Sequence, residues 1–214
     1  MNTEGNLELE GEVIDAYTQE KIAGRNIIIQ GLVMVNKKLV PIEAGHLLTD
    51  SSGRFSFSLN KVKNAYHYNF CLVGDSDYTS ANNKISLYNL KRDSKFLSFS
   101  LDKMVDLSLR IERKSNNRDY DTLRLDWKSN EVPYWELYPY TVYNSGNTNY
   151  NGSFATTRNL KWIGGNINAT VKTRVFADKI TTLHWQLKRK GKIQEITDTI
   201  ICRRDFMNVV YFTY

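Results

Sequence analysis

The chain has 214 residues, and 41% of them are hydrophobic, which is enough apolar material for the core of one large domain or of two smaller ones. No apolar stretch approaches the roughly 18 residues of a membrane-spanning helix. The formal charge of +6 is uneven, because residues 1–103 carry 12 basic and 12 acidic side chains and residues 104–214 carry 17 and 11. These values exclude wholesale disorder and a protein built from membrane-spanning helices.

Apolar and polar residues alternate along the chain with a period of two, which is typical of half-buried β-strands. No apolar stripe with the helical period of about 3.6 residues is longer than two turns. The clearest alternating segments are, in chain order, residues 7–13, 54–59, 66–73, 105–111, 122–128, 167–175 and 183–187. We therefore predict an all-β protein with about 14 short strands separated by turns. Asp50-Ser-Ser-Gly53 is predicted to form one tight turn, because an Asp oxygen can accept hydrogen bonds from the backbone N–H groups ahead of it and Gly accepts positive φ.

That number of strands is about twice the seven of a small β-sandwich. The charge balance also changes near residue 103, although no Pro/Gly-rich linker marks the position. We predict two β-sandwich domains, residues 1–103 and 104–214, joined by a short connection. The second is expected to be an immunoglobulin-like sandwich.

Three sequence motifs occur in a characteristic order in the first half. They are Gly-Glu-Val-Ile-Asp at 11–15, an Ile-x-Gly step at 22–24 and Thr-Asp-Ser-Ser-Gly-Arg-Phe at 49–55. This order resembles the carboxypeptidase regulatory-like (transthyretin-like) domain, with a match over residues 7–75 of a domain expected to reach residue 103. Residues 31–47 depart from the family pattern by inserting a long apolar hairpin.

The resemblance implies a seven-stranded, transthyretin-like sandwich in which the motif glycines and aspartates have structural roles. It also implies an exported protein of a Gram-negative bacterium related to Bacteroides, in the periplasm or at the outer-membrane surface. There such domains precede other β domains on lipoproteins. We therefore expect the mature part of a lipoprotein, with membrane attachment only through a lipid anchor outside this chain.

Motifs for catalysis are missing from the sequence. It has no His-x-x-Glu, as a metallocarboxypeptidase requires, and no Gly-x-Ser-x-Gly nucleophile elbow. The three histidines are widely scattered, so we predict no metal, no cofactor and no enzymatic activity. The alternative is a hydrolase that uses scattered carboxylates, which would be chosen from Asp121, Asp126, Glu131 and Glu136.

Two oxygen-rich pairs, Asp75 with Asp77 and Asp119 with Asp121, resemble fragments of calcium loops but lack the further carboxylates that close such a site. We interpret them as solvated turns. The two cysteines, Cys71 and Cys202, are interpreted as two buried thiols, with one bridge as the alternative.

Aromatic and asparagine residues concentrate between residues 127 and 162, and all four tryptophans lie in the second half of the chain. Aromatic rings beside amide groups suit sugar rings and also protein interfaces, while the alternative is packing in the core. If the protein binds a ligand, we predict that the second domain binds a glycan or a protein partner. The predicted ligand-binding residues are Tyr134, Trp135, Tyr138, Tyr140, Tyr143, Asn147 and Tyr150.

Basic residues gather at 188–192 and at Arg203-Arg204. Nucleic-acid binding would require a coherent basic face with aromatic rings placed to stack on bases. We interpret these residues as a charged hairpin tip and a turn, and predict no nucleic-acid partner.

Overall fold

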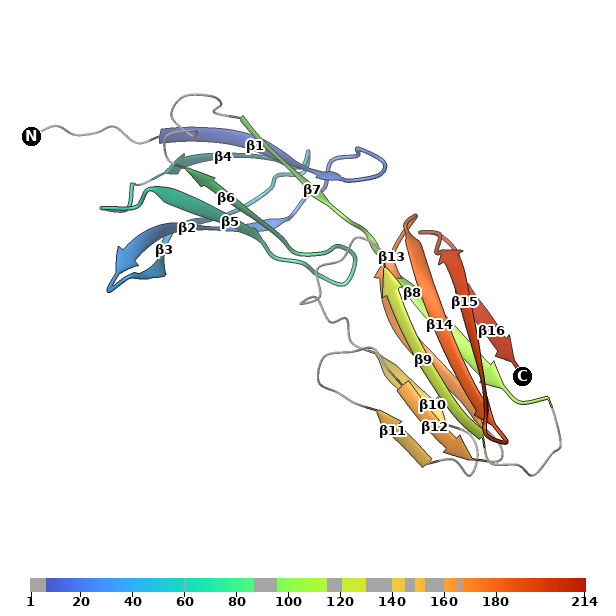
Figure 1. The fold of residues 1–214 in the computed structure, drawn as a ribbon. Coiled ribbons are helices and arrows are strands. Elements are labelled where there is room, and N and C mark those ends of the chain that lie inside the picture. Colours follow the sequence, from blue (N-terminus) through green and yellow to red (C-terminus); the bar gives the residue numbers. More distant parts are fainter. Residues whose placement is uncertain are drawn as a thin grey trace, which may run out of the picture. The chain divides into compact units, whose positions relative to one another are not determined.

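A computed structural model describes most of the chain. The described residues are 7–59, 61–86, 96–114, 121–129, 140–144, 149–152, 160–164 and 167–214. Within these ranges the structure contains β-strands and no helix, so none of these residues forms a helix that could cross a membrane. The predicted all-β sandwich class is confirmed. The chain forms two compact units, Met1–Lys103 and Met104–Tyr214, which we describe separately (Figure 1).

Within the described residues the first unit contains seven strands, which form two sheets (Figure 1). The central strand of the first sheet, β1(Leu7–Asp15), is antiparallel to β4(Arg54–Leu59) and parallel to β7(Phe96–Leu101). This sheet has the order β4-β1-β7. The second sheet has the order β3(Lys38–Leu48)-β2(Asn26–Val35)-β5(His67–Leu72)-β6(Ala81–Ser86).

Alternating apolar residues of both sheets form the core of this unit. Phe99 of β7 packs on Phe55 of β4 and on Phe70 of β5, with ring centroids 6.0 and 5.8 Å apart. Gly11 lies where β1 crosses this cluster, and a Cβ atom there would be 2.1 Å from the Leu97 carbonyl oxygen and 2.4 Å from the Phe55 ring. Position 11 therefore needs glycine because of close packing.

The Asp50–Gly53 turn is formed as predicted. The Asp50 carboxylate accepts hydrogen bonds from the backbone N–H groups of Ser52 (2.8 Å) and Arg54 (2.9 Å). The bond from Arg54 is the main reason that the pKa of Asp50 lies below its usual value. Gly53 has φ +70°, which an L-residue rarely adopts. The motif residues of this turn therefore serve to build the fold.

The inserted apolar segment forms a hairpin of β2 and β3, as predicted. Asn36 and Lys37 connect the two strands with φ values of 48° and 63°, as a two-residue type I′ turn requires. The end of the hairpin exposes several apolar side chains, among them Met34 at 60% and Leu39 at 51%.

Within the described residues the second unit contains nine strands, also in two sheets (Figure 1). One sheet has the order β10(Thr141–Asn144)-β13(Asn168–Phe176)-β8(Met104–Glu112)-β16(Asn208–Thr213), with β16 parallel to β8. The other has the order β11(Asn149–Gly152)-β12(Leu160–Gly164)-β9(Asp121–Ser129)-β14(Ile180–Arg189)-β15(Lys192–Ile201).

The core between these sheets contains three of the four tryptophans. Trp127, Trp162 and Trp185 are at most 3% exposed. The Trp185 indole of β14 stacks on the Phe212 ring of β16, with centroids 4.1 Å apart and planes 6° from parallel. These rings fill the space between two sheets, so they are not available to a ligand.

A buried ion cluster joins the ends of strands in the same unit. The Asp121 carboxylate has no exposed surface and accepts two hydrogen bonds from Arg189, at 2.9 and 2.8 Å. Arg113, whose side chain is 1% exposed, lies 3.6 Å from the same carboxylate. Burial, followed by the negative charge of Asp121, raises the pKa of the neighbouring Tyr214 hydroxyl to about 12.

The two cysteines belong to different units, and neither forms a disulfide. Cys202 is buried, and burial raises its pKa to about 11. Cys71 is only half-buried, with a pKa also raised by burial, so the prediction of two buried thiols agrees with Cys202 and is wrong for Cys71.

Candidate functional site

The predicted ligand-binding segment is described only in part. Tyr134, Trp135, Tyr138 and Asn147 lie outside the described residues, and the structure describes the strand that holds Tyr150 but not its side chain. The structure therefore places only the side chains of Tyr140 and Tyr143, and it places them in different environments.

Tyr140 belongs to the core rather than to an open surface. Its ring packs against the core of the second unit and meets the buried Trp127 ring edge-on, with centroids 5.7 Å apart and planes at 87°. Its hydroxyl oxygen is buried without a hydrogen-bond partner among the described residues. For Tyr140, core packing is therefore the better of the two interpretations that the sequence allows.

Tyr143 lies on the outward face of β10 and is 54% exposed. It stands opposite Thr170 of β13, Thr170 stands opposite Arg110 of β8, and Arg110 stands opposite Tyr211 of β16. These four residues form one row across the whole sheet, which we call the tyrosine row. Neighbouring strands are about 4.8 Å apart, so the two tyrosines begin about 14 Å from each other.

Each tyrosine of the row is accompanied by a cation. The Lys172 ammonium lies 5.4 Å from the centroid of the Tyr143 ring. The Arg110 guanidinium carbon lies 5.4 Å from the centroid of the Tyr211 ring, and its Nη1 donates a hydrogen bond to the Tyr211 hydroxyl at 3.2 Å. Tyr211 remains 62% exposed. The cations thus hold the rings on an open face.

Charges around the tyrosine row leave this face weakly cationic. Arg174 forms an ion pair with Asp106 at 3.4 Å, and Glu112 occupies the next outward position along β8 after Arg110. Because Asp106 is paired with Arg174, Glu112 is the one remaining carboxylate beside Arg110 and Lys172 on the described strands. Flat aromatic surface, hydrogen-bond donors and a small positive charge suit a planar or acidic group of a ligand.

The carboxylates proposed for a hydrolase do not form a pair. Asp121 and Asp126 both lie in β9, but they are five positions apart and so point to opposite faces of the sheet. Asp121 is buried with Arg189, whereas the Asp126 carboxylate lies 3.1 Å from Nδ1 of His184 on the outward face. Glu131 and Glu136 lie outside the described residues. The pairing of Asp121 with Asp126 is therefore wrong.

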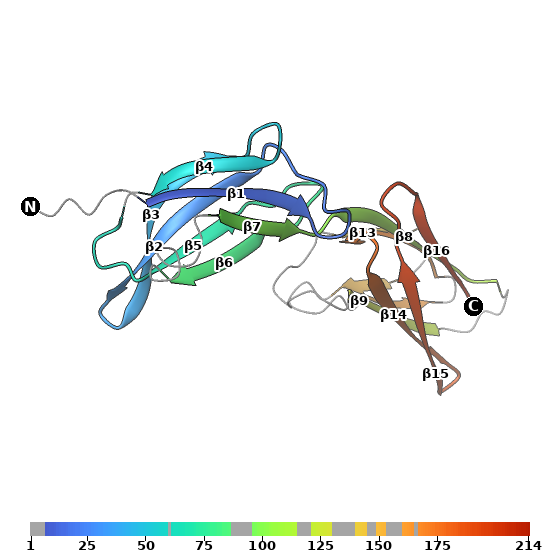
Figure 2. The same ribbon diagram turned by 90° about the horizontal axis from the view of Figure 1, so that it is seen from above.

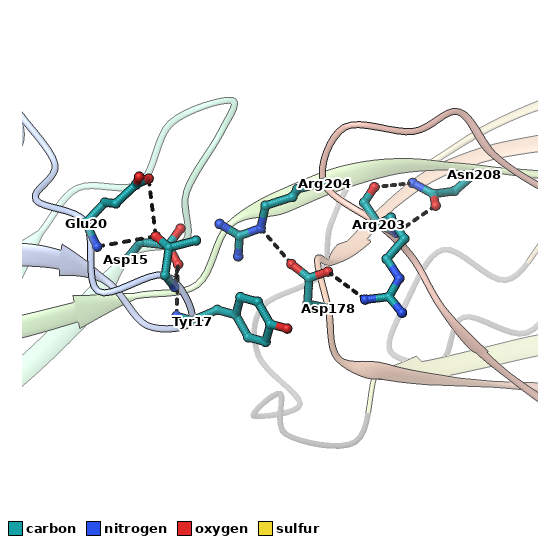
Figure 3. Close-up of polar contacts among 8 residues, drawn as sticks. Asp15, Tyr17, Glu20, Asp178, Arg203, Arg204 and Asn208 are labelled. Carbon is teal, nitrogen blue, oxygen red and sulfur yellow. Dashed lines mark hydrogen bonds and ion pairs between the residues drawn. The ribbon is translucent and has the colours of Figure 1, made fainter.

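Polar turns account for other charged motifs of the sequence. Asp178 accepts a hydrogen bond from Nε of Arg204 at 2.6 Å and lies 3.7 Å from Nη1 of Arg203, whose backbone is held by Asn208 (Figure 3). The Arg203-Arg204 pair thus stabilises the turn that leads into β16, as the interpretation of a structural turn predicts.

An analogous turn in the first unit is built on Asp15, a residue of the family motif. Its carboxylate accepts hydrogen bonds from the backbone N–H groups of Tyr17 and Thr18, at 2.8 and 2.9 Å, and its own N–H donates to the Glu20 carbonyl oxygen at 2.8 Å (Figure 3). Asp15 is 1% exposed, so its role is structural.

Metal binding finds no support among the described side chains. No group of three His, Cys, Asp or Glu residues gathers there closely enough to hold an ion. Asp75 accepts hydrogen bonds from the backbone N–H groups of Asp77 and Tyr78 and forms an ion pair with Arg25, so it is a turn residue as expected. Asp119 lies outside the described residues, and Asp121 is a buried residue of β9, so the interpretation of a solvated turn is wrong for Asp121.

A hollow of about 300 Å³ opens on the first unit beside β1 and β4. Leu48, Arg54 and Phe96 contribute to its lining together with Asp50. The Asp50 carboxylate accepts hydrogen bonds within its own turn through Oδ1, and the bond from Arg54 lowers its pKa, which makes it a weaker base than an ordinary carboxylate.

Comparisons with known proteins are limited to low structural similarity. No family model and no curated protein matches the sequence. The full-length major pilin SpaD from Corynebacterium diphtheriae is similar with a TM-score of 0.37 and 8% identity, over 93% of this chain and 65% of SpaD. The shaft pilin SpaA from Lactobacillus rhamnosus GG gives 0.35 and 11%, over 98% and 97%. A streptococcal ancillary pilin gives 0.36 and 11%, over 100% and 63%. No function is inferred from similarity at these values.

The sequence contained no direct signal for half of the tyrosine row. Arg110 and Tyr211 are separated by 101 positions and become neighbours only through the parallel pairing of β8 with β16. Alternation alone marks both as outward residues, but it does not tell which strands lie side by side.

Proposed function

We propose that this protein is a non-enzymatic, extracytoplasmic binding or assembly module that holds a protein or glycan partner on the second unit. The observation that carries the proposal is the tyrosine row, in which Tyr143 and Tyr211 stand exposed on a flat sheet face beside Lys172 and Arg110. Exposed tyrosines fixed beside cations are enriched at binding surfaces.

The two rings and the two cations provide complementary contacts. A tyrosine face packs against the apolar face of a sugar ring or against an aliphatic side chain, while the guanidinium and ammonium groups donate hydrogen bonds to hydroxyl or carboxylate oxygens. By analogy with stacking on bases, each ring contact contributes about 1–3 kcal/mol. Two rings with one charged contact contribute about 3.5–9 kcal/mol together, which corresponds to micromolar affinity at the upper end of this range.

The first unit is proposed to be a carboxypeptidase regulatory-like spacer, which rests on the motif order in residues 7–75. Its motif residues are committed to turns and to close packing, as Gly11 and Asp50 illustrate. The same resemblance supports a place outside the cytoplasm, in the periplasm or on the outer membrane of a Gram-negative bacterium.

The test compares matched tyrosine substitutions in the full chain. The double variant Tyr143→Ala/Tyr211→Ala removes both rings of the row. Tyr66→Ala in the first unit, where the ring is 74% exposed, is the control for loss of an exposed tyrosine. The probes are an array of neutral and acidic glycans and a pull-down of cell-envelope proteins with the immobilised chain.

We expect a glycan or protein bound by the wild type to bind the double variant at least about tenfold more weakly and the control unchanged. Thermal unfolding of the second unit should be the same in all three proteins, because the two rings are on the surface. A ligand that binds the double variant and the wild type equally well would contradict the proposed site. Turnover of a bound substrate would contradict the non-enzymatic function.

A further inference from the structure

Strand β15 is the outermost strand of its sheet and is exposed on both faces. It pairs with β14 from Lys192 to Ile201, and no other described strand pairs with it (Figure 2). All its residues except Ile200 are exposed. The exposed side chains include Ile193 at 60%, Ile196 at 38% and Ile201 at 49%. A long edge strand that exposes isoleucine side chains is a template for pairing with another strand.

The direction of the free backbone groups is given by one hydrogen bond. The Thr199 N–H donates to the carboxylate of its neighbour Asp198 at 2.8 Å, so it points away from β14. Backbone groups alternate in direction along a strand. The groups of Ile193, Glu195, Thr197, Thr199 and Ile201 therefore all point toward the free edge.

We propose that this edge binds β15 of a second copy of the chain, in antiparallel pairing about a two-fold axis at Thr197. Opposite residues must both direct their backbone groups into the new ladder, so odd-numbered residues stand opposite odd-numbered ones. With Thr197 on the axis, Ile193 of each copy stands opposite Ile201 of the other, and Glu195 stands opposite Thr199. The sequence of β15 is thus complementary to itself.

Charge distinguishes this register from its neighbours. An axis at Glu195 would place the two Glu195 carboxylates opposite each other, and an axis at Asp198 would do the same for Asp198. Like charges directly opposite destabilise a sheet. An axis at Ile196 avoids this and places the two Ile196 side chains opposite each other, but it leaves Ile201 opposite Gly191 and loses both pairs of Ile193 with Ile201. The register at Thr197 is therefore preferred.

The inner face of the strand supports the same pairing. Ile196 and Ile200 stand opposite the buried Trp185 and Thr181 of β14, so they point to the core side of the sheet. In the proposed register, Ile196 of one copy stands opposite Asp198 of the other. Its diagonal neighbours are Ile196 and Ile200 of that copy, so the four isoleucines approach one another along the diagonals, beside the two Asp198 side chains. Two sheets of five strands become one continuous sheet.

Association is expected to be weak and reversible. One strand edge buries less surface than a standard protein interface, and the Asp198 carboxylate must release the Thr199 N–H before this group can bond across the axis. We place the dissociation constant in the micromolar range or above, on the order of that of small transient interfaces.

The test is a pair of identical substitutions two residues apart on the same face of the strand. Thr197→Lys places two ammonium groups opposite each other on the axis. Thr199→Lys places an ammonium opposite Glu195 at two symmetric positions. Analytical ultracentrifugation of the full chain, over a concentration range up to about 1 mM, measures the dimer constant at low salt.

We expect Thr197→Lys to weaken the dimer about fivefold and Thr199→Lys to leave it unchanged or strengthen it up to about tenfold. A wild type that stays monomeric over the whole range would overturn the proposal. Equal weakening by both variants, or strengthening by Thr197→Lys, would overturn the register. None of these three results bears on the tyrosine row, which lies on the other sheet of the second unit.

Cross-linking provides a second readout that does not depend on affinity alone. Thr197→Cys brings two thiols face to face, within the distance of a disulfide. Thr199→Cys faces Glu195 instead and carries the same two native cysteines. Under mild oxidation the first variant should form a covalent dimer and the second should not. Dimers of both in equal amounts would reject the axis at Thr197.

Discussion

Replacement of Asp121 by Asn should unfold the second unit at a much lower temperature. The change keeps the shape of the side chain and removes only its charge. Arg189 is 30% exposed and can turn toward water, whereas Arg113 is 1% exposed and would keep its charge inside the protein without the Asp121 carboxylate beside it. Breaking a buried ion pair in this way costs about 3–5 kcal/mol.

For a domain of this size that loss lowers the melting temperature by about 12–20 °C. The assay is intrinsic tryptophan fluorescence during heating, because all four tryptophans lie in residues 104–214 and the signal reports on the second unit alone. The control is Asp106→Asn, whose carboxylate is 93% exposed in its ion pair with Arg174, and it should change the free energy of unfolding by less than about 1 kcal/mol.

A double variant isolates the cause. If the loss of the Asp121 carboxylate beside the buried Arg113 charge is responsible, Asp121→Asn combined with Arg113→Met should be more stable than Asp121→Asn alone, since the buried guanidinium is then removed as well. A single variant within about 1 kcal/mol of the wild type, or a double variant no more stable than the single one, would refute the reasoning.

Two further predictions concern packing and pH. Gly11→Ala should destabilise the first unit by about 1–3 kcal/mol or more, since the new Cβ meets the Leu97 carbonyl oxygen and the Phe55 ring, and calorimetry should show only the first unit affected. Because the pKa of Cys202 rises from 9.0 unfolded to about 11 folded, its contribution to stability is present below pH 9 and is lost as the pH rises to 11. Fluorescence-detected unfolding should show that the free energy of unfolding falls over this pH range in the wild type and falls less in Cys202→Ala. Equal declines in the two proteins would contradict the assignment of this pH dependence to Cys202.

The parts of the fold that could be predicted from the sequence are those that local chemistry determines. Alternation identified strands such as Leu7–Asp15 and Met104–Glu112, because a period of two is imposed by the pleat itself. Turn chemistry identified Asp50–Gly53, because only a short acceptor side chain and a residue with positive φ satisfy that turn. Both signals lie within a few residues of the structure they predict.

Sequence reasoning was less successful where the answer depends on register between distant strands. Arg110 and Tyr211 meet because β16 runs parallel to β8. Asp121 meets Arg189 because the hairpin of β14 and β15 places its tip beside the start of β9. Neither pairing leaves a local pattern in the sequence, so a search for neighbouring motifs does not find them.

The two described tyrosines of the predicted site illustrate why composition alone misplaces a binding surface. Tyr140 and Tyr143 are three positions apart and were equal candidates by composition. Val142 packs against the core and so fixes the inward parity of β10. Tyr140 shares that parity and packs on Trp127, whereas Tyr143 has the opposite parity and stands exposed beside Lys172. The density of aromatic residues indicates where rings gather, and the parity of the strand decides which of them a partner can reach.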